Sequence, residues 1–61
     1  MRTFIITGGS RGIGRGICRS MAKSGHNIIF TYNTDRSAAE ENQLFIKTNF
    51  NVECEFIQVK N

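Results

Sequence analysis

The glycine-rich run at residues 8–16 constrains the fold more than any other part of the sequence. The residues before it, Thr-Phe-Ile-Ile at positions 3–6, form a short apolar and β-branched segment that is typical of a buried strand. After it, Ile13, Ile17 and Met21 recur every four residues, which predicts one apolar stripe on a helix. We therefore expect the glycines to lie on the turn where a strand passes into a helix.

A turn of this kind is suited to binding an anion. The first backbone amides of a helix have no partner within the helix, and the aligned peptide dipoles place about half a positive charge there. Glycines allow a tight turn, a close approach of the backbone to phosphate, and close packing of helix on strand. Gly8, Gly12 and Gly14 can serve these three purposes in that order.

The glycine spacing excludes two better-known phosphate-binding loops. The pattern G-x-G-x-x-G fails because its third glycine would fall on Ile17 or Arg19. The nucleoside triphosphatase loop fails because Arg15 and Gly16 stand where a lysine and a hydroxyl residue are required. The run is therefore expected neither to hold a γ-phosphate nor to bind magnesium through a loop hydroxyl.

The pattern that does match is Thr-Gly-x-x-x-Gly-x-Gly, at Thr7, Gly8, Gly12 and Gly14. On these residues the chain resembles the short-chain dehydrogenase/reductase family. Residues 10–15 are most similar to its 3-oxoacyl-[acyl-carrier-protein] reductase branch. The resemblance covers essentially the whole chain but only the first quarter of a typical member. The alternative is a glycine-rich turn that merely connects a strand to a helix.

The rest of the chain predicts an α/β fold with the element order β-α-β-α-β. We expect strands at residues 2–7, 26–32 and 52–59, and helices at residues 11–24 and 37–48. Two crossover helices make the strands parallel, and the first strand is expected to be central. This is the N-terminal half of a Rossmann-type doubly wound parallel sheet, so residues 1–61 are expected to be part of a longer NAD(P)-binding domain.

Local signals predict where the two helices begin and end. Gly25 is expected to follow the first helix because glycine tolerates positive φ. Residues 37–40, Ser-Ala-Ala-Glu, predict a capping box at the start of the second helix. The buried side of the second helix is expected to contain Ala38, Ala39, Leu44, Phe45 and Ile46.

Composition restricts the possible functions. The formal net charge is +3, but only Arg11, Arg15 and Arg19 concentrate positive charge, so a nucleic-acid partner is not expected. Cys18 and Cys54 are far apart and the chain has a single histidine, so we expect no metal site and two buried, reduced thiols. No segment approaches the ~18 apolar residues of a membrane span, and no signal peptide is evident. These observations predict a cytoplasmic location and no membrane partner.

The choice between NAD(H) and NADP(H) depends on the end of the second strand. An acidic residue there binds the ribose of NAD, whereas an arginine accommodates the 2′-phosphate of NADP. The resemblance places this position at Tyr32, followed by Asn33, and matches Arg11 to a basic position of NADP-preferring members. We therefore expect NADP(H) rather than NAD(H). Asp35 can approach the ribose if the turn shifts, or else bind turn amides or Arg36.

The expected cofactor-binding residues lie in two short segments. They are Gly8, Gly9, Ser10, Arg11, Gly12, Ile13, Gly14, Tyr32 and Asn33. The family usually carries an aspartate at the end of the third strand, over the adenine, but residues 58–61 contain none. Adenine recognition therefore receives no support from this segment.

The chain lacks the residues on which the family's chemistry depends. That chemistry needs a Tyr-x-x-x-Lys pair, but Tyr32 is the only tyrosine and Arg36 lies four residues after it. We therefore assign no catalytic residue and expect this chain alone to be inactive. The resemblance implies that the whole protein is an NADPH-dependent reductase of carbonyls similar to 3-oxoacyl thioesters, and it is compatible with a homo-oligomer. The alternatives are a stand-alone module that binds a dinucleotide or phosphate, and a truncated remnant without function.

Overall fold

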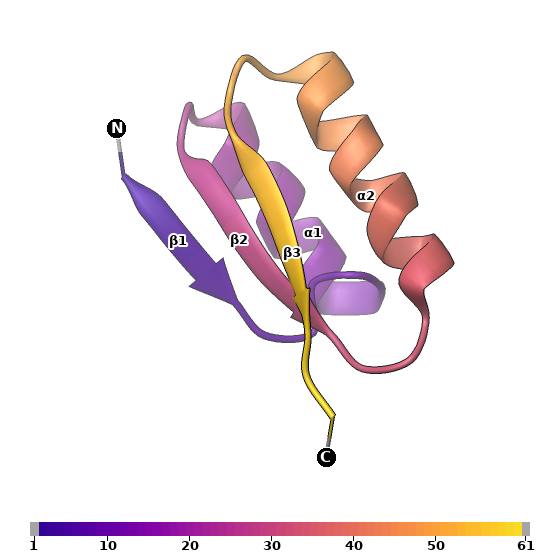
Figure 1. The fold of residues 1–61 in the computed structure, drawn as a ribbon. Coiled ribbons are helices and arrows are strands. Elements are labelled where there is room, and N and C mark those ends of the chain that lie inside the picture. Colours follow the sequence, from indigo (N-terminus) through magenta and orange to yellow (C-terminus); the bar gives the residue numbers. More distant parts are fainter. Residues whose placement is uncertain (1, 61) are drawn as a thin grey trace.

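Three parallel strands and two helices alternate along the chain (Figure 1). The computed structural model describes residues 2–60. The elements are β1 (Thr3–Ile6), α1 (Gly12–Lys23), β2 (Asn27–Tyr32), α2 (Arg36–Asn49) and β3 (Cys54–Gln58). The predicted β-α-β-α-β order is confirmed, and each element lies close to its predicted limits.

The sheet has the strand order β1-β2-β3, so β2 lies in the middle. Within residues 2–60, β1 pairs with β2 alone and is an edge strand, so the prediction of a central first strand is wrong for this part of the chain. Burial alternates along β1, and Ile5 is 72% exposed. Ile5 is exposed because the helices cover the opposite face of the sheet.

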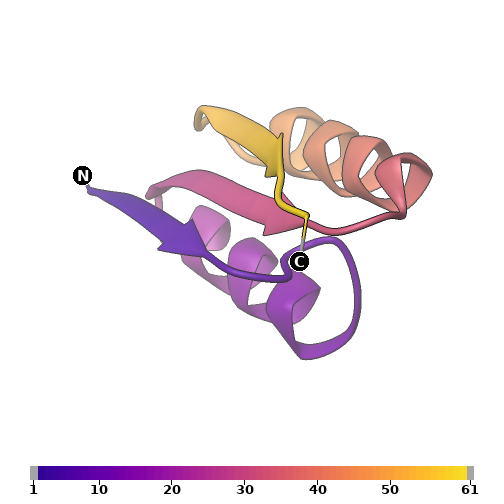
Figure 2. The ribbon, with the colours of Figure 1, turned by 60° about the horizontal axis from the view of Figure 1, so that its bottom comes forward.

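Both helices pack against one face of the sheet (Figure 2). Helix α1 lies against β1 and β2, and α2 lies against β3. The register aligns Ile6, Phe30 and Phe56 in one row across that face. The buried cluster between the layers consists of Cys18, Ala22, Ile28, Phe30, Tyr32, Ala39, Ile46 and Cys54.

The side of α1 that faces the sheet is not the predicted apolar stripe. Ile13 is 85% exposed and Ile17 is 43% exposed, whereas Cys18 and Ala22 are buried. Met21 is only partly buried at the edge of the cluster. The smaller side chains lie on the sheet, and the larger ones lie beside the contact or point to solvent.

Close contact between α1 and the glycine run explains this arrangement. A methyl group on Gly14 would overlap the carbonyl oxygen of Gly8. A methyl group on Gly9 would lie 2.7 Å from Sγ of Cys18 and 2.5 Å from Cβ of Phe30. Isoleucine on this side would hold the helix away from the sheet, so only small residues fit there.

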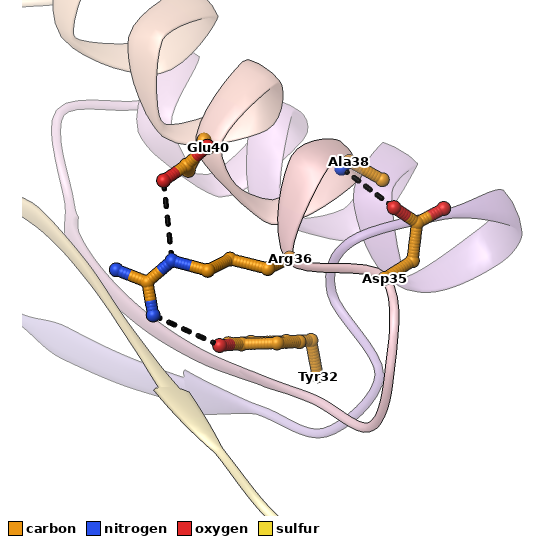
Figure 3. A network of polar contacts seen from close by, with 5 residues as sticks. All are labelled: Tyr32, Asp35, Arg36, Ala38 and Glu40. Carbon is orange, nitrogen blue, oxygen red and sulfur yellow. Dashed lines mark hydrogen bonds and ion pairs between the residues drawn. The ribbon is translucent and has the colours of Figure 1, made fainter.

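The N-cap of α2 lies two residues earlier than the capping box at Ser37 predicts. Its N-cap is Asp35, whose Oδ1 accepts a hydrogen bond from the backbone amide of Ala38 at 3.0 Å (Figure 3). Glu40 binds Nε of Arg36 at 3.2 Å instead of reaching back to a backbone amide. The capping-box prediction is therefore wrong, because aspartate competes with serine as an N-cap.

The buried side of α2 consists of Ala39, Asn42 and Ile46. The predictions for Ala39 and Ile46 are confirmed. Those for Leu44 and Phe45 are wrong, because these side chains are 68% and 38% exposed. The three buried residues follow the helical period, on which Leu44 and Phe45 lie to the side.

The two thiols are buried and free, as predicted. Burial raises the pKa of Cys18 to about 11 and that of Cys54 to about 11. Gly25, after α1, has a φ of +90° and confirms the predicted helix end. Helix α1 therefore ends, and β2 begins, close to where the sequence indicates.

His26 has a local structural role. Its Nδ1 accepts a hydrogen bond from the backbone amide of Arg2, and its ring contacts Phe4 edge-on. Among residues 2–60 no group of three or more potential metal ligands comes together. Neither helix in this range has the length and hydropathy needed to cross a bilayer.

Candidate functional site

The loop between β1 and α1, residues 7–11, is here called the glycine loop. It lies beside the carboxyl end of β2 (Figure 2). The backbone amide of Gly8 donates to Oγ1 of Thr31 at 3.1 Å, and the amide of Gly9 donates to the Thr31 carbonyl at 3.0 Å. Thr31 thus attaches the loop to β2. Sequence reasoning missed this residue, because a threonine in a β-branched strand carries no distinguishing signal.

The glycines of the loop and of the first turn of α1 have conformations or contacts that suit glycine. Gly8 has a φ of +68° and Gly12 a φ of +62°, and both leave open space where a side chain would lie. L-residues with a side chain adopt such values at a cost. Gly14 fills the third role, since the backbone of Gly8 lies directly against it.

The N-cap residue of α1 does not cap the helix with its own side chain. Arg11 is the N-cap residue, in an extended conformation with φ −146° and ψ 163°, and its side chain makes no capping hydrogen bond. The first turn of α1 contains no acidic residue. The first amides of a helix then need another partner, and an anion provides one.

Two grooves meet at this loop. The first groove, of about 290 Å³, is lined by Thr7, Gly8, Thr31, Tyr32, Asn33 and Val59. The second groove, of about 210 Å³, is lined by Gly8, Ser10, Arg11, Tyr32, Asn33, Thr34 and Asp35. The structure thus brings the two predicted binding segments together, with Gly8, Tyr32 and Asn33 common to both grooves.

The other predicted site residues differ in how far they are buried: Gly9 and Ser10 are inside, whereas Ile13 is exposed. Ser10 is buried, with 8% of its surface exposed, and Gly9 is also buried. Ile13 projects into solvent from the first turn of α1. Ile13 can therefore contribute its backbone amide to an anion site, while its side chain stays outside both grooves.

Arg11 and Asp35 form an ion pair on the second groove. Nη1 of Arg11 lies 3.8 Å from Oδ2 of Asp35, and both side chains are substantially exposed. The other carboxylate oxygen of Asp35 caps α2 through Ala38. Asp35, the acidic residue that lines the second groove, therefore has two local partners. A local role for Asp35 is confirmed, but through Ala38 and Arg11 rather than through Arg36.

The side chain of Tyr32 belongs to the core. Tyr32 is 3% exposed, its ring contacts Phe56 edge-on, and its hydroxyl accepts a hydrogen bond from Nη1 of Arg36 at 3.3 Å (Figure 3). Arg36 is held in turn by Glu40. The Tyr32 hydroxyl is thus engaged on the α2 side, and Asn33 is the exposed member of the predicted pair.

The end of β3 closes the first groove. The backbone amide of Val59 donates to the Tyr32 carbonyl at 2.8 Å, and Nε2 of Gln58 donates to the Asn33 carbonyl at 2.9 Å. Asn61, the last residue of the segment expected to lack the adenine aspartate, lies outside the described residues. The described part of that segment offers backbone and apolar surface to the groove.

A second side chain that sequence reasoning missed reaches the loop from α2. Nδ2 of Asn42 donates to the carbonyl of Gly9 at 2.9 Å, and Oδ1 of Asn42 accepts from Nε of Arg19 at 2.9 Å. Asn42 is completely buried. The helical spacing of Asn42 from Ala39 and Ile46 is the signal that could have identified it as inward-facing.

Comparison with known proteins gives a consistent result. Residues 2–60 match the family model described as short chain dehydrogenase. An uncharacterized oxidoreductase of Bacillus subtilis, YmfI, is 39% identical over 57 residues, which cover 93% of this chain and 24% of that protein. The L-rhamnose 1-dehydrogenase (NADP(+)) of Thermoplasma acidophilum is 54% identical over 40 residues, which cover 66% of this chain and 16% of that protein.

A solved structure shares the whole described fold. The alcohol dehydrogenase of the archaeon Thermococcus sibiricus, complexed with 5-hydroxy-NADP, aligns with a TM-score of 0.88 and 27% identity. The alignment covers 97% of this chain and 25% of that one. This chain therefore spans about a quarter or less of the length of these proteins.

Proposed function

The chain belongs to the short-chain dehydrogenase family, and we propose that residues 1–61 form the NADP(H)-binding N-terminal part of such an oxidoreductase. The observation that carries the proposal is the meeting of the glycine loop with the end of β2 around the second groove. In this groove a loop suited to a pyrophosphate lies beside a basic side chain, Arg11. No acidic residue occupies position 32 or 33.

The residues present fit a dinucleotide. The uncapped start of α1 and the glycine loop would hold the pyrophosphate, with Gly14 allowing the helix to approach. Asn33, Thr34 and Arg11 would bind the phosphorylated ribose at the second groove. The nicotinamide group, when bound, supplies or accepts the hydride of the family's reaction.

The preference for NADP(H) over NAD(H) rests on charge. A guanidinium gives a planar set of donors for a phosphate dianion, which NAD(H) lacks at this position. Two of the similar proteins support the same preference, since one is named as an NADP(+) enzyme and the other was solved with 5-hydroxy-NADP. Asp35 lies on the same groove, but its carboxylate is bound by Ala38 and Arg11.

We further propose that the whole protein reduces a carbonyl group, similar to that of a 3-oxoacyl thioester, in the cytoplasm. The 61 residues contain no Tyr-x-x-x-Lys pair, so this chain alone should bind cofactor without reducing a carbonyl. An in-frame reading of the gene beyond codon 61 that encodes such a pair would support this proposal. A genuine stop codon there would leave a stand-alone binding module or a remnant.

Titration of the purified chain with NADPH and NADH tests the proposed function. We expect NADPH to bind about tenfold more tightly than NADH, a difference of about 1.4 kcal/mol. Arg11→Gln should remove most of this difference. Arg2→Gln is the matched control, because it removes the same charge at the opposite end of β1. Equal affinities in the unsubstituted chain would contradict the NADP preference, and no binding of either would contradict the binding function.

A further inference from the structure

Asn42 is a buried polar residue on the side of α2 that faces the core. It has no exposed surface, and its neighbours on that side, Ala39 and Ile46, are apolar and equally buried. Burying an amide in this setting is costly unless both its donor and its acceptor are satisfied. Asn42 satisfies both, with Gly9 on the donor side and Arg19 on the acceptor side.

Arg19 determines which end of the Asn42 amide faces the loop. A guanidinium has only hydrogen-bond donors, so it fixes the carbonyl end of the amide toward itself. The NH₂ end is then directed at the Gly9 carbonyl. Arg19 is itself positioned by Phe45, because its Cζ lies 3.7 Å from the centre of that ring.

Gly9 is held on both sides of its Cα atom. Its amide donates to the Thr31 carbonyl at 3.0 Å, and its carbonyl accepts from Nδ2 of Asn42 at 2.9 Å and from Sγ of Cys18 at 4.0 Å. Contacts with Phe30 and Cys18 leave no space for a side chain. The orientation of the Gly9–Ser10 peptide is therefore determined by α1, α2 and β2 together, and Asn42 on α2 makes the shorter of the two hydrogen bonds to the Gly9 carbonyl.

The direction of the Ser10 amide follows from this orientation. In a planar trans peptide, the N–H points opposite to the C=O that precedes it. Because Asn42 draws the Gly9 carbonyl toward α2, the N–H of Ser10 points away from α2. Ser10 lines the second groove together with Gly8 and Arg11.

We propose that Asn42 is a positioning residue for the anion-binding loop: through the Gly9 carbonyl it holds the Ser10 amide in the orientation that binds the pyrophosphate. This inference rests on the proposed function, since a dinucleotide supplies the pyrophosphate. Asn42 does not contact the ligand. Its effect passes through the Ser10 amide of the glycine loop, which would hold the pyrophosphate, whereas Arg11, Asn33 and Thr34 would bind the phosphorylated ribose. We therefore expect the effect to concern the pyrophosphate more than the 2′-phosphate.

Asn42→Asp tests this role with almost no change in shape. A carboxylate has no hydrogen to donate to the Gly9 carbonyl but still accepts from Arg19. Gln43→Glu is the matched control, because it makes the same amide-to-carboxylate change on the same helix. Nε2 of Gln43 donates to the Cys54 carbonyl at 2.7 Å, away from the loop.

The test compares two ligands that differ in the pyrophosphate, with affinities measured from NMR titrations. For Asn42→Asp, we expect NADPH to bind about 3- to 10-fold more weakly, the range for one hydrogen bond. Adenosine 2′-monophosphate, which has no pyrophosphate, should change by less than about 2-fold. Gln43→Glu should change neither. Equal weakening of both ligands in Asn42→Asp would show a merely structural role and overturn the proposal, as would no weakening of either.

Two further measurements keep the proposal testable. If Asn42→Asp unfolds, the same comparison is made with Arg19→Met, which leaves the Asn42 amide free to flip. Selective weakening of NADPH binding then supports the proposal, and equal weakening of both ligands overturns it.

If the unsubstituted chain does not bind NADPH, the proposed function fails separately. Inorganic pyrophosphate then serves as the probe: a Ser10 amide shift that Asn42→Asp or Arg19→Met diminishes supports the positioning role. An unchanged shift, or none in the unsubstituted chain, overturns it.

Discussion

Nη1 of Arg11 and Oδ2 of Asp35 lie 3.8 Å apart on the second groove, where the 2′-phosphate of NADP(H) would bind. Asp35 thus places a negative charge beside the basic residue expected to bind that phosphate. Its other oxygen caps α2, so the carboxylate has both an electrostatic and a structural role.

Asp35→Asn should separate these two roles. Asparagine is as good an N-cap as aspartate, so the free energy of unfolding should hardly change. Removing the negative charge should strengthen NADPH binding by about 3-fold, or about 0.6 kcal/mol, with little effect on NADH. Asp35→Ala should in addition lose about 1 kcal/mol of stability with the cap. Weaker NADPH binding in Asp35→Asn would show that the carboxylate supports the site.

The attachment of the glycine loop to β2 is tested by Thr31→Val. The substitution keeps the shape and the backbone carbonyl but removes the Oγ1 that accepts from the Gly8 amide. We expect a loss of about 0.5–1 kcal/mol in the free energy of unfolding, measured by urea denaturation, and weaker NADPH binding. Thr3→Val, on an exposed position of β1, is the control. An unchanged NADPH affinity would show that the hydrogen bond between Gly8 and Thr31 does not support cofactor binding.

Gly14 and Gly16 offer a comparison within one helix. Alanine at Gly14 would overlap the backbone of Gly8, whereas alanine at Gly16 would enter open space. Gly14→Ala should therefore destabilise the fold by about 1–3 kcal/mol. Gly16→Ala should stabilise it by about 0.5–1 kcal/mol through helix propensity. Thermal denaturation measures both, and equal effects would contradict the close contact between α1 and the loop.

Alkaline pH should destabilise the fold through its two buried thiols. The folded-state pKa of Cys18 and of Cys54 is raised from 9.0 to about 11, so the folded chain keeps protons that the unfolded chain loses. The contribution of the protonated thiols to the free energy of unfolding is fully present below about pH 9 and is lost as pH rises toward 11. The loss should reach about 1.4 kcal/mol per pH unit for each thiol. Cys54→Ala should reduce this slope in urea denaturation series; an unchanged slope would contradict thiol burial as its cause.

The sequence was sufficient to predict the order of the elements and the position of the glycine loop. Those features depend on local signals, namely apolar strands, helix periodicity and glycines at fixed spacing. The contact side of α1 was predicted wrongly, because hydrophobicity favoured Ile13 and Ile17 while the space beside Gly8 and Gly9 admits only small residues. The distance at which a helix packs against a neighbouring segment cannot be read from the sequence of either element alone.

The start of α2 and the role of Asn42 were also beyond local reasoning. Asp35 and Ser37 are both good N-cap residues, so local sequence does not distinguish between them. In the folded chain Asp35 is the N-cap, directly after the turn that follows β2. Asn42 is a polar residue of the kind that usually faces solvent, yet it is buried, and two partners from distant segments satisfy its amide. Such a pairing becomes visible only when α1, α2 and the loop are in place.

The binding of NADPH by the glycine loop is tested most directly by backbone amide NMR of the ¹⁵N-labelled chain. We expect the largest shifts on adding NADPH at residues 8–14 and at Tyr32 and Asn33, which line or adjoin the two grooves. Amides at the opposite end of the sheet, such as those of Arg2 and Asn27, should stay unchanged. Shifts centred elsewhere, or none at saturating NADPH, would contradict the proposed site.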